Sequence, residues 1–76
     1  ETLCAINTHM FKLKILYPSS YAYDTADTRT AALCLELYTQ HGIESYQSSS
    51  SVLEFDCVAH RTLAAMKLHS VDFELL

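Results

Sequence analysis

Apolar and polar side chains alternate along residues 11–17, FKLKILY, with the period of two that is typical of a β-strand buried on one face. The same alternation returns at residues 51–57 and 71–76 and predicts two more strands. A fourth, weaker edge strand is expected at residues 42–47, before a polar hairpin loop at 48–51. The side chains predicted to face the core are Phe11, Leu13, Ile15, Tyr17, Leu53, Phe55, Cys57, Val71, Phe73 and Leu75.

A helix is predicted over residues 25–41, after Pro18 ends the first strand because proline has no N–H to donate. Asp24 is the expected N-cap, and Gly42, the only glycine, suits a left-handed C-cap. At 100° per residue the apolar face is broad, which favours either packing against a second helix or a surface for a partner. That face comprises Ala31, Cys34, Leu35 and Tyr38, widened by Leu33 and Leu37.

A second helix is predicted over residues 57–68, with Asp56 as its N-cap. Its expected apolar stripe is Ala59, Leu63 and Met66, with Thr62 beside it. The resulting order, β-α-β-β-α-β, is the split pattern of ferredoxin-like domains. The sequence therefore predicts an α+β fold with a four-stranded antiparallel sheet and two helices on one face.

Residues 11–76 are expected to form this single domain, and residues 1–10 an N-terminal arm or an extra edge strand. In the predicted sheet the first strand lies between the third and the fourth. The charged side chains of its open face would then form a ladder of opposite charges, which contributes more to register than to stability. We expect Lys12 and Lys14 to be flanked by Glu54 and Asp56 on one side and by Asp72 and Glu74 on the other.

The composition limits the classes of function. Half of the residues are hydrophobic and the formal net charge is −4, which favours a small globular domain and argues against a binder of phosphate backbones. Three widely spaced cysteines, at positions 4, 34 and 57, do not make a disulfide framework and indicate a reducing compartment. No apolar run has the length of a membrane span, so a cytoplasmic protein is expected.

RNA recognition on this fold needs aromatic side chains on the open face of the first and third strands, where the chain offers Lys12, Lys14, Glu54 and Asp56. We therefore expect no nucleic-acid partner. A nucleic-acid mimic, with carboxylates in place of phosphates, is a weaker alternative because the acids are spread along the chain and some are paired with lysines.

Cys57 and His60 form the one chemical motif, since a thiol at a helix N-terminus is nearer its thiolate and a histidine three residues on can share a metal or a proton with it. His69 or a second subunit would have to complete a metal site. The simpler interpretation is a buried, inert thiol, because Cys57 continues the inward set of its strand. No cofactor is expected.

The leading hypothesis is a non-enzymatic domain that binds a larger protein with a basic or neutral surface and regulates or inhibits it. In being compact, acidic and without catalytic motifs, the chain resembles inhibitors encoded by phages or mobile elements. An obligate homodimer, paired through the N-terminal arm or the weak second strand, is the structural alternative. The predicted contacts are Tyr21, Tyr23, Leu33 and Leu37, with Glu54, Asp56, Asp72 and Glu74 steering association.

Overall fold

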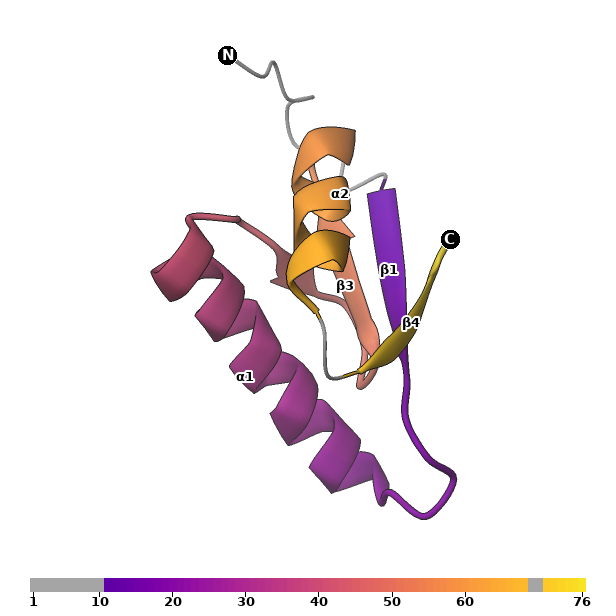
Figure 1. Ribbon diagram of the computed structural model, residues 1–76. Helices are drawn as coiled ribbons and strands as arrows, with labels where there is room; N and C mark the ends of the chain where they lie inside the picture. Colours follow the sequence, from indigo (N-terminus) through magenta and orange to yellow (C-terminus); the bar gives the residue numbers. More distant parts are fainter. Residues whose placement is uncertain (1–10, 69–70) are drawn as a thin grey trace.

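The computed structural model describes residues 11–68 and 71–76, and the predicted N-terminal arm lies outside them. The elements follow the predicted β-α-β-β-α-β order (Figure 1). The sheet has the order β2-β3-β1-β4, and every neighbouring pair is antiparallel. This confirms the α+β class and is consistent with a ferredoxin-like arrangement. The elements are β1 (Phe11–Leu16), α1 (Tyr23–His41), β2 (Tyr46–Gln47), β3 (Val52–Phe55), α2 (Val58–Lys67) and β4 (Asp72–Leu75).

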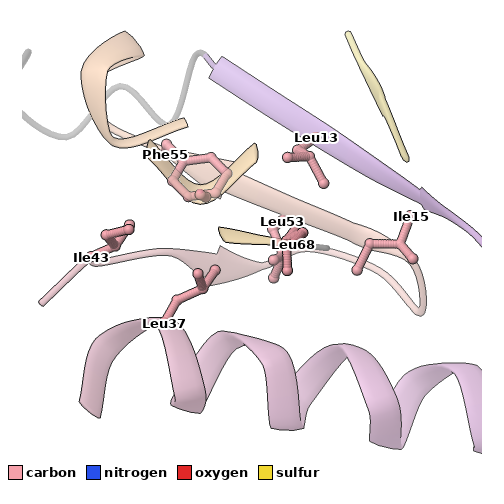
Figure 2. Packing of buried hydrophobic residues seen from close by; sticks show 8 residues of the cluster. Leu13, Ile15, Leu37, Ile43, Leu53, Phe55 and Leu68 are labelled. Carbon is pink, nitrogen blue, oxygen red and sulfur yellow. The ribbon is translucent and has the colours of Figure 1, made fainter. Parts of the chain in front are cut away.

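The central strand β1 places alternate side chains in the core, as its pattern predicts. Leu13 lies opposite Leu53 of β3 and Leu75 of β4, and both Leu13 and Leu53 are fully buried. Figure 2 shows Leu37 of α1 and Leu68, next after α2, in the same cluster. Both helices therefore cover one face of the sheet. The buried cluster consists of Leu13, Ile15, Leu37, Ile43, Leu53, Phe55, Ala64 and Leu68.

The open face carries the expected lysines, but the predicted ladder is only partly correct. Lys12 lies opposite Glu54, with 4.0 Å between the Lys12 Nζ and the Glu54 carboxylate, and Lys14 lies opposite Glu74. On the β3 side, however, Lys14 faces Val52 and not Asp56. Antiparallel strands run in opposite directions, so the next residue on the same face of β3 is 52.

The antiparallel register also places Asp72 of β4 differently from the prediction. Asp72 lies opposite Leu16 and therefore flanks neither lysine. Because the Lys12 side chain is exposed, its pair with Glu54 contributes at most about 1 kcal/mol. The face is thus a mixed polar surface, and the buried side of the sheet stabilises the fold.

Helix α1 begins two residues before the predicted start. The first helical bond joins the Ala26 N–H to the Ala22 carbonyl, so Ala22 and not Asp24 is the N-cap. Asp24 lies inside the first turn, where its charge favours the positive end of the helix dipole. The predicted C-cap is confirmed, because Gly42 has φ 67° and donates its N–H to the Tyr38 carbonyl.

The buried face of α1 is rotated by about a third of a turn from the predicted one. Ala26, Thr30 and Leu37 are buried, whereas Leu35 and Tyr38, predicted to face inward, are exposed. Thr30 is buried although it is polar, because its hydroxyl is hydrogen-bonded inside the protein. Helix α1 makes its main contacts with β2 and β3, and α2 with β1 and β3. Packing between the helices therefore does not explain the broad apolar face of α1.

Helix α2 also differs from its prediction. It begins at Val58 with Cys57 as N-cap, so Asp56 does not cap it. Its fully buried residue is Ala64, while Leu63 and Met66 of the predicted stripe are exposed. The small Ala64 side chain permits close approach to the sheet. Neither α1 nor α2 has the length and apolar character to cross a membrane, and residues 11–68 and 71–76 hold no other helix.

One arginine of α2 contacts residues of β1 and of the chain just after β4. The Arg61 guanidinium lies 5.6 Å from the centre of the Phe11 ring, and its Nη1 donates to the Leu76 carbonyl at 3.0 Å. A cation over an aromatic ring and a charge-assisted hydrogen bond both favour this position. Arg61 thereby links the helix to the first and last strands.

We predict that two leucines of α1 differ sharply in their effect on stability. Leu37→Ala removes a side chain that is 2% exposed and should lower the free energy of unfolding by about 2–5 kcal/mol. Leu35→Ala, at a position that is 64% exposed, should change it by no more than about 0.5 kcal/mol. Urea unfolding followed by circular dichroism measures both. Equal losses, or a larger loss at Leu35, would show that the helix presents its other face to the sheet.

Candidate protein-interaction surface

The loop between β1 and α1 holds two tyrosines in a fixed arrangement. The Tyr21 N–H donates to the Pro18 carbonyl at 3.0 Å and closes a turn. This turn brings the Tyr21 ring against Tyr17, with 5.4 Å between ring centres and 19° between ring planes. Stacked aromatic pairs of this kind contribute about 0.5–1.5 kcal/mol beyond the area they bury. The tyrosine pair therefore orders the loop.

A chain of hydroxyl groups anchors this pair to the rest of the domain. The Thr30 Oγ1 donates to the Ser50 carbonyl at 2.6 Å and lies 2.8 Å from the Tyr17 hydroxyl. Since the single Thr30 proton goes to Ser50, the Tyr17 hydroxyl is the donor in the second bond. Thr30 is the one buried polar side chain in the described part of the chain. It joins the end of β1 to α1 and to the β2–β3 loop.

Two hollows of about 380 Å³ lie beside the tyrosine pair, and Tyr17 and Tyr21 border both of them. Arg29 and Asp72 border one hollow, and Lys14 borders the other. A wall of aromatic rings between recesses with charged edges offers apolar area together with polar contacts, as protein interfaces do.

Tyr23 extends this surface from the first residue of α1. Its side chain is 71% exposed and borders the second hollow, while Tyr21 is 39% exposed. The two tyrosines that the sequence favours for binding therefore lie next to each other on the surface. Their role in binding remains a prediction. We call Tyr17, Tyr21 and Tyr23, with the two hollows, the tyrosine surface.

The predicted helix contacts lie elsewhere. Leu37 is buried in the core and cannot contact a partner, so its proposed role is wrong. Leu33 is half-buried and packs against the same core. The helical spacing shows that α1 has a broad apolar face, but it does not identify Leu37 as the part of that face that contacts the sheet.

The four predicted acidic residues all lie on or beside the open face of the sheet. Glu54 faces Lys12, Glu74 faces Lys14, and Asp72 reaches the rim of the first hollow. Asp56, just beyond β3, accepts a hydrogen bond from the Tyr46 hydroxyl at 3.4 Å. Of the four, Asp72 alone borders the tyrosine surface.

Cys57 is buried and caps α2 through its backbone, whose carbonyl accepts the His60 and Arg61 N–H groups. This burial agrees with the interpretation of an inert thiol. Within residues 11–68 and 71–76, no three histidine, cysteine or acidic side chains come close enough to hold a metal. His69, the third residue of the alternative site, lies outside the described residues.

Sequence reasoning missed a third recess, which lies between the exposed side of α1 and β2. Its wall on α1 is the stripe that was expected to face the core, and its other wall belongs to the segment entering β2. The pairing of these two segments depends on how α1 crosses the sheet, which hydrophobic periodicity does not encode. We call it the α1–β2 groove, lined by Ala31, Cys34, Leu35, Tyr38, Glu44, Ser45 and Tyr46.

Comparison of the chain with protein-family models, with curated proteins and with solved structures finds no match.

The hydroxyl chain at Thr30 generates a prediction. Thr30→Val keeps the shape of the side chain but leaves the Tyr17 hydroxyl and the Ser50 carbonyl without their partner, which should cost about 1–3 kcal/mol of unfolding free energy. For a domain of this size the melting temperature should fall by about 4–8 °C for each kcal/mol lost. Thr28→Val, at an exposed position of the same helix, is the control and should have little effect. Similar melting temperatures for both variants would refute an anchoring role for Thr30.

Proposed function

We propose that this domain binds another protein through the tyrosine surface and regulates or inhibits that partner by occupying part of it. The observation that carries the proposal is the stacked Tyr17–Tyr21 pair beside two hollows, held by the hydrogen bond from Tyr17 to Thr30, which itself donates to the Ser50 carbonyl. Catalysis is not part of the proposal.

The loop between β1 and α1 is suited to binding because its conformation is already fixed before a partner arrives. A tyrosine ring that is already fixed loses little conformational entropy when a partner covers it, and ordering an interfacial side chain otherwise costs about 0.5–1.5 kcal/mol. Tyr21 is held by its turn and by the stacked ring of Tyr17. Tyrosine is also among the residues that most often dominate binding energy at interfaces. We therefore expect Tyr21 to be the anchor and the exposed Tyr23 to add area.

Charge favours a partner with a basic or neutral surface. The chain has nine acidic and five basic side chains, and Asp72 stands at the edge of the tyrosine surface. Complementary charge mainly raises the association rate and excludes unsuitable partners. Glu54, Asp56 and Glu74 on the sheet would contribute to this steering at longer range.

The location that we propose is the cytoplasm. The three cysteines are too widely spaced for a disulfide framework and Cys34 carries a free thiol, which suits a reducing compartment. The Cys57 thiol is buried in the protein, and this burial would also protect it from oxidants.

The proposal is tested by comparing the proteins captured from a cell extract by the immobilised wild-type domain and by the double variant Tyr21→Ala/Tyr23→Ala. We expect one partner to be retained by the wild type and lost by the variant, with a loss of affinity of at least about 30-fold, or 2 kcal/mol, when the purified partner is titrated. Circular dichroism should show that the variant remains folded, because both side chains are partly or largely exposed.

Met66→Ala is the matched control, since Met66 is 62% exposed on α2 and far along the chain from the loop. It should bind like the wild type. Retention of the same partner with unchanged affinity by the double tyrosine variant would contradict the proposal, as would an equal loss with Met66→Ala.

A further inference from the structure

The α1–β2 groove is a second surface, distinct from the tyrosine surface. It has a volume of about 390 Å³ and is lined on one side by residues 31, 34, 35 and 38, which share one side of α1. Leu35 and Tyr38 are 64% and 58% exposed. Tyr46 of β2, also exposed, borders the other side. The groove is therefore an apolar recess beside an edge strand.

The register of the hairpin sets the direction of the backbone groups along this edge. The Ser48 N–H donates to the Val52 carbonyl, so positions 48 and 46 of the edge strand direct their backbone groups toward β3. In an antiparallel ladder the residues between them direct theirs away. The N–H and C=O groups of Ser45 and Gln47 consequently face the outer edge of the sheet.

One contact supports this assignment. The Cys34 thiol donates to the Ser45 carbonyl at 3.4 Å, which requires that carbonyl to point toward α1 and not toward β3. A thiol is a weak donor, and a carbonyl oxygen has a second lone pair for another donor. The Ser45 carbonyl can therefore accept a stronger hydrogen bond while Cys34 stays in place.

The charged residues around the groove are acidic. Glu44 borders it, and Asp56 accepts the hydrogen bond of the Tyr46 hydroxyl. The negative charge acts on Tyr46 itself: the Asp56 carboxylate, then desolvation, then the Glu44 carboxylate raise the pKa of its phenol above the usual 10.0. No lysine or arginine lines the groove within the described residues. A positively charged ligand group is thus favoured at this end.

From these observations we propose that the α1–β2 groove binds an extended peptide segment of a partner protein, in which apolar residues alternate with lysine or arginine. The segment adds a short strand to the outer edge of β2. Its apolar side chains contact Leu35 and Tyr38 on the helix side, and its basic side chains lie on the opposite face, near Glu44 and Asp56. This is the strand-addition mode of peptide recognition, and helix α1 forms one wall of the site.

The backbone groups decide between an extended and a helical ligand. A helix satisfies its own backbone and has no hydrogen bonds to offer Gln47, whereas an added strand pairs with its N–H and C=O. Residues 44–46 border the groove and Gln47 continues the same edge. Together they span about 13 Å at the rise of a strand, which is room for about four residues of ligand. A short extended segment is therefore the ligand that uses the whole groove.

The test begins with a random dodecapeptide library displayed on phage and selected in parallel on the wild-type domain and on Leu35→Glu. We expect the wild type alone to enrich peptides that alternate apolar residues with lysine or arginine. One such peptide, synthesised together with a scrambled version, is then titrated into the ¹⁵N-labelled domain. The amides of residues 45–47 and of 31–38 should shift and saturate, while those around Tyr21 should not.

Variants of exposed residues separate binding from folding. Leu35→Glu should weaken the selected peptide at least about tenfold, and Glu44→Gln should weaken it several-fold with greater loss at low salt. Leu63→Glu, which places the same charge on an exposed leucine of α2, should bind as the wild type does. N-methylation of a peptide amide that pairs with Gln47 should also abolish binding.

Several outcomes would overturn the proposal. These are enrichment that is equal on wild type and Leu35→Glu, selected peptides without basic residues, and shifts that map to another surface. A dimer in solution that Leu35→Glu converts to monomer would overturn it as well, because a second copy of the chain would then occupy the groove. The tyrosine variants leave this site intact, so failure here and failure of the proposed function are distinguishable.

Discussion

The hydroxyl group of Thr30 is the contact on which the arrangement of the domain depends. It donates to the Ser50 carbonyl and accepts from Tyr17, so a single buried side chain fixes helix α1 to the hairpin loop and to the end of β1. A polar group in this position is stable only because both of its hydrogen bonds are made. Together with the burial of Leu37, these bonds determine which side of α1 faces the sheet.

That rotation determines what is core and what is surface. With Thr30 inward, Leu37 joins the core cluster, whereas Leu35 and Tyr38 remain in solvent beside β2. The same contact holds the Tyr17 ring in place for Tyr21 to stack on. The tyrosine surface and the α1–β2 groove therefore both follow from the orientation of α1 against the sheet. A core this small covers only one side of a helix of 19 residues, which leaves apolar side chains for partners.

The strands could be predicted from the sequence because a sheet buried on one face imposes a period of two. Leu13 and Leu53 follow that period and are fully buried, and Gly42 ends α1 because its φ is positive. Asp24 suits an N-cap, which favours a later start for α1, whereas the turn at Pro18 leads to an extended Ala22 whose carbonyl already accepts the first helical hydrogen bond. Local capping preference was outweighed by the geometry of the preceding loop.

The helix faces could not be predicted in the same way. A count of apolar residues selects Leu35 and Tyr38 for the core in place of Thr30, because it cannot represent a buried hydroxyl with hydrogen-bond partners. It also selects Leu63 in place of the small Ala64, because it cannot represent the close approach of a helix to the sheet. Of the candidate sites, the exposed tyrosines followed from their place in a loop. The groove did not, because it joins α1 to the edge of β2 through tertiary packing.

The most direct test of this account is a ¹³C-edited nuclear Overhauser measurement on the whole chain that asks which side of α1 faces the sheet. The account predicts cross-peaks from the Thr30 methyl group to the Tyr17 ring and from the Leu37 methyls to Leu53 and Phe55. Cross-peaks from Leu35 to those same two core residues, with none from Leu37, would contradict it. In that case the tyrosine surface would lose its anchor and the groove would be part of the core.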